Sequence, residues 1–284
     1  MKKSKVKYSN YTSTTWDLCE FDSLLEFYNY ITENPTNKAF ENKHKSSQEV
    51  GRKDYSHKNL YWHGTKTYEE AISLFKNGWS EGAQELTLKL KKIETQKEVQ
   101  TQYKNILSMC GYQAIVPLYL QDVPNNMINK KLVPVKNKVI TINRAICCSS
   151  SVSPDTLKNE SVKCFLIIKK IEQAGIRVNL NLLISTGHVC VKIRLKSANE
   201  KLNISKLAFP LIHPAMFRRL YFRFIETYPT IPKSYVYGYG SVIDESTFKN
   251  VCGKNEFLLP TLLKGTSNDN IVKLSVDELM SKLS

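Results

Sequence analysis

The feature that most constrains the fold is a strand–helix–strand pattern in the second half of the chain. Ser153-Pro154 is a typical helix start, with serine as the cap and proline at the first helical position. Apolar residues then recur at helical spacing as far as Gly175. Strand-like segments flank this helix at 133–142 and 176–184, and a further one follows a short turn at 189–195. The pattern predicts an α/β fold, a Rossmann-like sheet with helices on both faces.

The first half of the chain has a different pattern, in which expected helices alternate with polar stretches. Apolar side chains share one helical face over 22–32, and a second helix starts at Thr67, where Glu70 completes a capping box. Residues 34–58 are polar and indicate a linker or exposed loop. We therefore expect three regions: an N-terminal helical region with its linker at 1–58, a motif-bearing helical segment packed on the core at 59–130, and an α/β core at 131–284.

Composition narrows the class of protein. The 284 residues are 42% apolar, enough to bury a sizeable core. Seven cysteines, an odd number without CxxC spacing, favour a reducing cytoplasm. No stretch approaches the roughly 18 apolar residues of a membrane span, and the basic start is not followed by an apolar segment. We expect no secretory signal and no membrane association.

The net charge of +15 favours a polyanionic partner, because clustered cations neutralise phosphate groups. Lysine is spread through the chain, however, and codon bias in an AT-rich genome explains that spread equally well. The best-placed lysines for a nucleic-acid contact include Lys89, Lys91 and Lys92. The alternative for these lysines is a solvated helix face.

Three arginines are more specific candidates for nucleic-acid binding. Arg218, Arg219 and Arg223 fall within six residues of a helix expected to begin at His213-Pro214. Arg219 and Arg223 are one turn apart, so both can face the same phosphate with a planar fork of donors. The alternative is internal pairing, with Glu226 three residues beyond Arg223.

Three blocks of motif residues appear in order along the chain. They are Trp62-His63-Gly64-Thr65 with Gly78-Trp79-Ser80-Glu81-Gly82; Val116-Pro117-Leu118-Tyr119-Leu120 with Pro124 and Met127; and His213-Pro214 with Arg218-Arg219. The blocks resemble those of an uncharacterised family encoded mainly by bacteriophages and bacterial mobile elements, although Asp122 stands where that family usually has glycine. The resemblance implies a viral or mobile-element origin and a location in the host-cell cytoplasm. It brings no enzymatic activity, cofactor or catalytic residue.

Residues 133–240 also resemble a von Willebrand factor A-like domain, in the order strand, serine-rich loop, long helix and Gly-Ile-x-Val strand. In that family the loop carries Asp-x-Ser-x-Ser, whose oxygen atoms hold a divalent cation. The corresponding stretch here, 143–151, lacks the aspartate and contains Arg144. We therefore expect the A-like fold without its metal ion, which would leave a binding scaffold.

An enzyme is the remaining class. His63-Gly64-Thr65 resembles a short ADP-ribosyltransferase motif in which the histidine, at a strand end, helps bind the dinucleotide. The aromatic and carboxylate partners of such a site would be Tyr112, Tyr119 and Glu226. In the structural alternative, Trp62 packs, Gly64 permits a tight turn and Thr67 caps a helix. The chain has no phosphate-binding glycine motif and no zinc-ligand spacing, so we expect no cofactor, no metal and no catalytic residue.

These patterns predict an accessory binding protein that acts on nucleic acid or a nucleoprotein complex. The alternative is a protein–protein adaptor or an inhibitor of a host system. A second alternative is an ADP-ribosyltransferase-like enzyme.

Overall fold

The computed structural model describes ten segments of the chain. They are residues 1–7, 15–37, 57–93, 103–132, 139–147, 152–173, 175–186, 189–229, 250–253 and 256–259. Two sheets lie within them, one at the centre of a main body and one in a smaller module.

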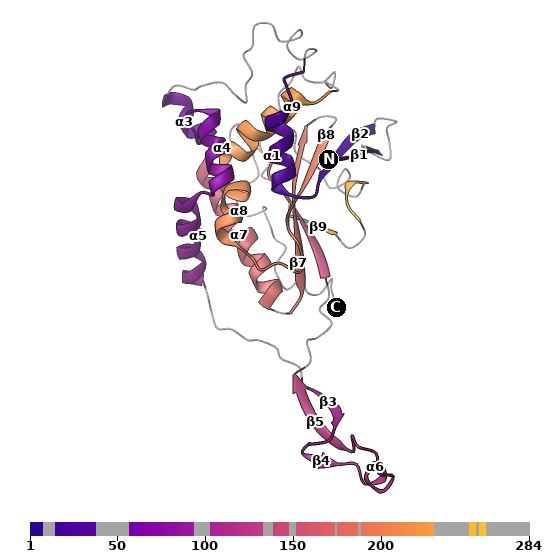
Figure 1. Ribbon diagram of the computed structural model, residues 1–284. Helices are drawn as coiled ribbons and strands as arrows, with labels where there is room; N and C mark the ends of the chain where they lie inside the picture. Colours follow the sequence, from indigo (N-terminus) through magenta and orange to yellow (C-terminus); the bar gives the residue numbers. More distant parts are fainter. Residues whose placement is uncertain are drawn as a thin grey trace.

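A six-stranded mixed sheet forms the centre of the body (Figure 1). In spatial order its strands are β1 (Lys2–Lys7), β2 (Thr15–Phe21), β8 (Val189–Lys196), β7 (Arg177–Thr186), β6 (Val139–Ala145) and β9 (Glu256–Leu259). β2 runs parallel to β8, and β6 runs parallel to both β7 and β9, whereas the β1–β2 and β7–β8 pairs are antiparallel. The predicted α/β fold class is confirmed.

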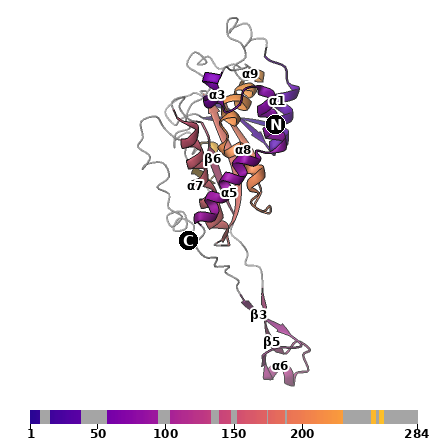
Figure 2. The same ribbon diagram turned by 90° about the vertical axis from the view of Figure 1, so that its left-hand side faces the viewer.

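The helices of the body lie together on one side of this sheet, as Figures 1 and 2 show. They are α1 (Leu24–Glu33), α3 (His57–His63), α4 (Tyr68–Asn77), α5 (Ser80–Ile93), α7 (Pro154–Gln173), α8 (Ile204–Ile212), the π-helix η1 (Met216–Tyr221) and α9 (Phe222–Thr227). The main core lies between them and the sheet, and alternate β7 residues such as Leu180 and Leu182 are fully buried in it.

The opposite face of the sheet does not carry the second helical layer that the sequence predicted, as far as the structure describes the chain. One part of it holds a small apolar cluster that includes Trp16, Leu183 and Val251. The rest is polar, because β7 places Asn179 and Asn181 there, between residues that face the helices. The two faces therefore differ in what they offer to a ligand.

Several local predictions are confirmed in detail. Glu70 N–H donates to Thr67 Oγ1 at 3.1 Å, and Gly78 ends α4 with a positive φ of 86°. Ser153 caps α7, accepting from Thr156 N–H at 3.2 Å. The strands expected at 176–184 and 189–195 form the antiparallel β7–β8 hairpin.

The prediction of a separate N-terminal helical region is wrong. β1 and β2 belong to the central sheet, and only α1 in residues 15–37 is helical. β1 escaped detection because its sequence, KKSKVK, shows lysines rather than alternating apolar residues. Residues 38–56 of the predicted linker, and the strand predicted at 235–239, lie outside the described residues.

Residues 103–132 form the second sheet, which we call the projecting module. It contains β3 (Tyr103–Ser108), β4 (Gln113–Ala114), the short helix α6 (Val116–Leu120) and β5 (Met127–Leu132), with β5 between the other two strands. Figures 1 and 2 show it apart from the body. The expectation that 59–130 packs on the core as one piece is therefore wrong for the module, although α4 and α5 do pack there.

Candidate functional site

The first and third motif blocks meet inside the body, although about 150 residues separate them in the sequence. The His213 ring lies so close to Gly64 that a Cβ there would approach its Cε1 to 2.8 Å, and Gly64 has a φ of +79°. Trp79 meets the same ring edge-on at 4.7 Å between centroids, and a Cβ on Gly82 would collide with Trp79. These contacts therefore hold three parts of the chain together: the turn at Gly64, the start of α5 and the segment at His213-Pro214.

His213 is held as a neutral ring at this junction. Its Nδ1 accepts a hydrogen bond from the Ala215 N–H at 3.2 Å, and its ring stacks on Phe209. Burial, reinforced by the nearby Lys158 ammonium, lowers the pKa of His213 to about 3. Pro214 is buried beside it, and Glu81 lies exposed in the first turn of α5. Among the described residues, the cavity beside His213 and Pro214 measures only about 20 Å³, which is room for a water molecule and not for a substrate.

The three candidate arginines are buried, with 0%, 0% and 1% of their surface exposed. Arg218 donates to the carbonyl oxygens of Trp62 (2.6 Å) and Val152 (3.0 Å), and its guanidinium lies 4.3 Å from the Trp62 ring centroid. Arg219 donates to the carbonyl oxygens of Thr65 at 2.8 Å and Lys66 at 2.6 Å. Both side chains thus fasten the first motif block to η1.

Arg223 fastens a different segment. It donates to Thr36 Oγ1 at 2.7 Å and the Asn34 carbonyl at 3.0 Å, and it lies 3.9 Å from the buried Glu226 carboxylate. The internal pairing with Glu226 is confirmed. The prediction that these arginines present a phosphate-binding face is wrong for this structure, because all three guanidinium groups are enclosed in the body.

The candidate lysines lie on α5. Lys89 forms an i,i+4 ion pair with Glu85 at 2.7 Å, and Lys91 is exposed. The side chain of Lys92 lies outside the described residues. Lys89 and Lys91 thus fit the alternative of a solvated helix face. Binding of nucleic acid by these lysines stays a prediction.

The residues of the ADP-ribosyltransferase hypothesis do not form a common site. His63 is the last residue of helix α3, not a strand end, and it is buried. Glu226 is fully buried against Arg223, while Tyr112 and Tyr119 are exposed on the projecting module. The structural alternative fits these positions, since Gly64 makes the close turn and Thr67 caps α4.

The segment that would carry the A-domain metal motif is also internal where it is described. Arg144 and Cys147 are buried, and the Cys147 sulfur accepts a hydrogen bond from the Ser185 N–H at 2.9 Å. Residues 148–151 lie outside the described part of the chain. Among the residues that are described, no three His, Cys, Asp or Glu side chains gather to hold a metal ion.

The second motif block builds the projecting module. Pro117 and Tyr119 lie exposed on α6, Pro124 is exposed in the following turn, and Met127 begins β5 half-buried. Asp122 adopts a positive φ of 55°, a conformation that glycine adopts freely and that other residues adopt less often.

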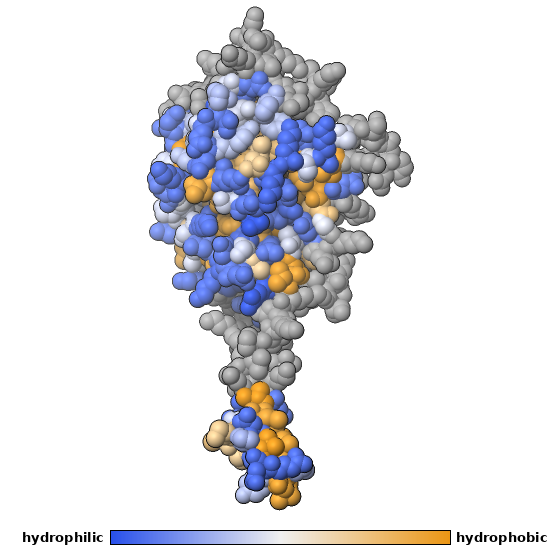
Figure 3. All heavy atoms as spheres, turned by 45° about the vertical axis from the view of Figure 1, so that its right-hand side comes forward, coloured by the Kyte–Doolittle hydropathy of each residue, from blue (hydrophilic) through white to orange (hydrophobic). Residues whose placement is uncertain are grey.

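The module exposes large apolar side chains without a core beneath them. None of the side chains described in it, at residues 105–130, is buried. Six large apolar side chains are more than half exposed: Leu107, Met109, Tyr112, Val116, Tyr119 and Leu120. Figure 3 shows the hydrophobic colour gathered on this module. A single-layer sheet usually buries one face against another element, so this surface is a candidate binding site.

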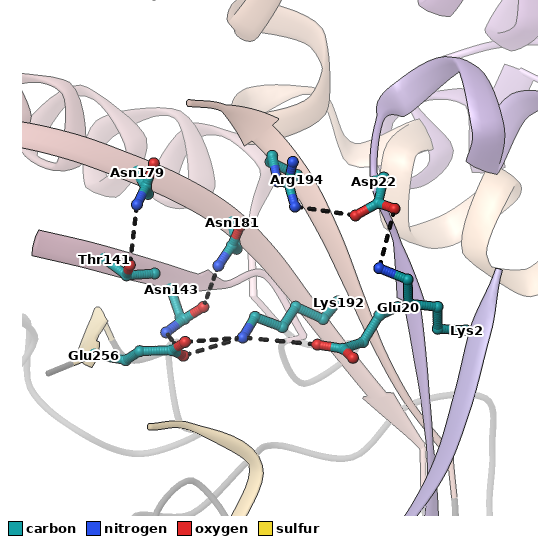
Figure 4. Close-up of polar contacts among 10 residues, drawn as sticks. All are labelled: Lys2, Glu20, Asp22, Thr141, Asn143, Asn179, Asn181, Lys192, Arg194 and Glu256. Carbon is teal, nitrogen blue, oxygen red and sulfur yellow. Dashed lines mark hydrogen bonds and ion pairs between the residues drawn. The ribbon is translucent and has the colours of Figure 1, made fainter. Parts of the chain in front are cut away.

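A second candidate lies on the open face of the six-stranded sheet, where a polar groove of about 290 Å³ crosses several strands (Figure 4). At its centre the Lys192 ammonium lies 3.1 Å from both carboxylate oxygens of Glu256 and 3.9 Å from Glu20. Nearer its edge, Asp22 pairs with Arg194 at 3.0 Å and with Lys2 at 3.4 Å.

Two buried carboxamides fix the central carboxylate of the groove. Asn181 Nδ2 donates to Asn143 Oδ1 at 2.9 Å, and Asn143 Nδ2 donates to Glu256 Oε2 at 2.8 Å. Asn179 Nδ2 donates to Thr141 Oγ1 at 3.4 Å on the same face. The hydrogen bonds orient Glu256 before any ligand arrives.

Sequence reasoning missed this groove, although part of its signal is visible. Asn179 and Asn181 alternate with apolar residues along β7, and Lys192 and Arg194 do so along β8, which indicates one polar face. Glu20 and Glu256 come from distant segments whose place beside β8 and β6 depends on the strand order.

Comparisons with known proteins place the chain in a family without assigning a function. No helix in the described part of the chain is long and apolar enough to cross a membrane. No curated protein and no solved structure matches the chain. The model of a domain family of unknown function, DUF7192, matches residues 9–283, so the chain belongs to the DUF7192 family.

Proposed function

We propose that this protein is a protein–protein adaptor whose contact element is the projecting module. The observation that carries the proposal is the six large apolar side chains exposed on a module without a buried side chain among residues 105–130. Contiguous exposed apolar surface on a folded protein usually marks an interaction site. The body, by contrast, has an extensive buried core of its own.

A protein partner suits this surface better than nucleic acid does. Four of the six side chains, Leu107, Met109, Val116 and Leu120, are aliphatic or thioether groups, which offer no flat ring on which a base can stack. The arginines that favoured a phosphate contact are buried. Apolar side chains beside tyrosines are instead typical of the central part of a protein interface.

The charge of the module indicates the chemistry of the partner. Residues 103–132 contain Lys104, Lys130 and Lys131 against one acid, Asp122, which gives a net charge of +2. Lys130 is exposed and lies 5.3 Å from the centroid of the Tyr112 ring. We therefore commit to a partner that presents an apolar patch with an acidic rim. In a bacteriophage or mobile-element setting that partner is a protein in the cytoplasm of the host cell.

The test compares two pairs of substitutions that remove similar exposed side chains. Val116→Ser with Leu120→Ser alters the module, and Leu25→Ser with Leu88→Ser alters positions on α1 and α5 of the body that are also more than 60% exposed. Each purified protein is immobilised and exposed to nuclease-treated bacterial extract, and captured proteins are purified and titrated back by calorimetry.

The proposal expects an acidic protein that binds the wild type and the body pair alike. The module pair should weaken its binding about tenfold or more. Equal binding by both pairs would contradict the proposal. The purified chain is also tested for binding to short DNA and RNA duplexes. If binding is salt-dependent, and Lys91→Ala weakens it while the module pair does not, the protein belongs to the nucleic-acid-binding class.

A further inference from the structure

The charges of the polar groove form two groups, which Figure 4 shows: a more enclosed group that we call the floor and a more exposed group that we call the rim. The floor holds Glu20, Lys192 and Glu256, with a net charge of −1, and the Lys192 and Glu256 side chains are only 15% and 20% exposed. The rim holds Lys2, Asp22 and Arg194, with a net charge of +1, and all three side chains are more than half exposed. Among the described residues, the floor thus has a net charge of −1 and the rim a net charge of +1.

The buried amides indicate that the floor is built for a ligand rather than for stability alone. Asn143 is fully buried and Asn181 is 7% exposed, and a buried carboxamide needs hydrogen-bond partners to offset the cost of its desolvation. Their hydrogen bonds fix Glu256, and Glu256 in turn holds Lys192 through both of its oxygens. Supporting layers of this kind are typical of preorganised binding sites.

Glu20 is the carboxylate at the floor that a ligand can reach. It is 41% exposed, and it lies 3.9 Å from Lys192, whereas Glu256 lies 3.1 Å from the same ammonium. At the rim, Asp22 is shared between two cations, so Arg194 and Lys2 together retain one positive charge for a ligand anion.

The strand geometry gives the distance between the floor group and the rim group of charges. Lys192 and Arg194 are two residues apart on β8 and share a face, which corresponds to about 7 Å along the strand. A groove of about 290 Å³ suits a molecule of modest size. We propose that it binds a small linear zwitterion, with its ammonium on Glu20 and its carboxylate on Arg194 and Lys2, the two groups standing roughly 7 Å apart.

The probe is 6-aminohexanoate, titrated calorimetrically into the full chain at low ionic strength. Two matched compounds each lack one of its charges: hexanoate has no ammonium and hexylamine has no carboxylate. We expect 6-aminohexanoate to bind about tenfold or more tightly than either, because each charged contact contributes to the affinity. Equal affinity for the three compounds, or no binding of any, would overturn the inference.

Matched variants assign the contacts. Glu20→Gln and Arg194→Gln should each weaken binding of 6-aminohexanoate about tenfold. Glu85→Gln on α5 and Arg177→Gln at the start of β7 make the same chemical changes outside the groove, and should leave the affinity unchanged. A groove variant that binds like its control contradicts the assignment, and thermal melting of each variant shows that it is folded.

This inference does not depend on the proposed adaptor function. The groove lies on the body, so the Val116→Ser with Leu120→Ser pair should bind 6-aminohexanoate like the wild type. A variant that loses binding to the protein partner but keeps binding to 6-aminohexanoate, or the reverse, shows that the two proposals can fail independently.

Discussion

The body and the projecting module use similar residue types in opposite ways. In the body, large side chains and even arginines are enclosed: Arg218 and Arg219 are fully buried and bind carbonyl oxygens. In the module, Tyr119 and Leu120 of the second motif block are exposed on a five-residue helix. The contrast shows that the motif blocks have two different roles: the first and third stabilise the interior of the body, and the second forms an exposed surface on the module.

The comparison also separates charge from function. The three arginines looked like the most specific phosphate ligands in the sequence, and they instead hold the segments at 34–36 and 62–66 against η1 and α9. Burial of these three arginines removes them from the cations that a polyanionic partner could contact. The candidate surfaces are an apolar module and a groove whose described charges balance.

The largest effect is expected from Arg218→Met. The substitution keeps much of the volume and leaves the Trp62 and Val152 carbonyl oxygens without this buried donor. We expect a loss of about 3–5 kcal/mol in the free energy of unfolding, measured in urea. Leu120→Ser in the module, at a side chain 76% exposed, should change it by about 0.5 kcal/mol or less. Comparable losses would remove the distinction between the two regions.

A pair of glycine substitutions tests the contact between the first and third motif blocks. Gly64 and Gly175 have nearly equal φ values of +79° and +82°, but only Gly64 has His213 against the position of a Cβ. Gly175→Ala should cost about 1 kcal/mol from backbone strain alone. Gly64→Ala should cost about 1–3 kcal/mol more from overpacking. Equal losses in chemical unfolding would show that the His213 contact adds nothing.

The last prediction concerns pH, where the change over a single pH unit is smaller than the losses expected from Arg218→Met and Gly64→Ala. The folded pKa of His213, about 3, lies below the ordinary value of 6.5, so the unfolded chain binds the extra proton between these limits. His213 therefore supports stability above pH 6.5 and loses that support as pH falls toward 3, by up to about 1.4 kcal/mol per pH unit.

His213→Gln removes this titration. The variant should be less stable at neutral pH, yet its unfolding free energy should fall less steeply with acid than that of the wild type. Urea unfolding at several pH values within the window measures both slopes. Parallel slopes would mean that the ring does not stay neutral in the folded body.

The parts of the fold that local chemistry decides were predictable. Thr67 and Ser153 cap their helices as expected, and the alternation along β7 and β8 gave a hairpin. The projecting module was not predictable, because β4 has only two residues and no sequence pattern indicates such a short strand. The direction of the arginines was left open between a phosphate contact and internal pairing, because helical spacing alone does not show whether the face that carries them is buried.

The candidate sites were less predictable than the fold. The second motif block pointed to residues of the module, such as Tyr119, without indicating that they are exposed. The groove needs Glu20 beside Lys192 and Glu256 beside Thr141, which are pairings between distant strands. Such pairings follow from the packing of the whole sheet and not from any local spacing.

The lysines of β1 have a consequence for how copies of the chain behave together. β1 lies at one edge of the described sheet, with backbone groups that a strand from another molecule would extend. Lys2, Lys3, Lys5 and Lys7 crowd this six-residue strand, so an added strand would bring ammonium groups into close quarters. The lysines of β1 therefore disfavour pairing of this strand with a strand of another copy.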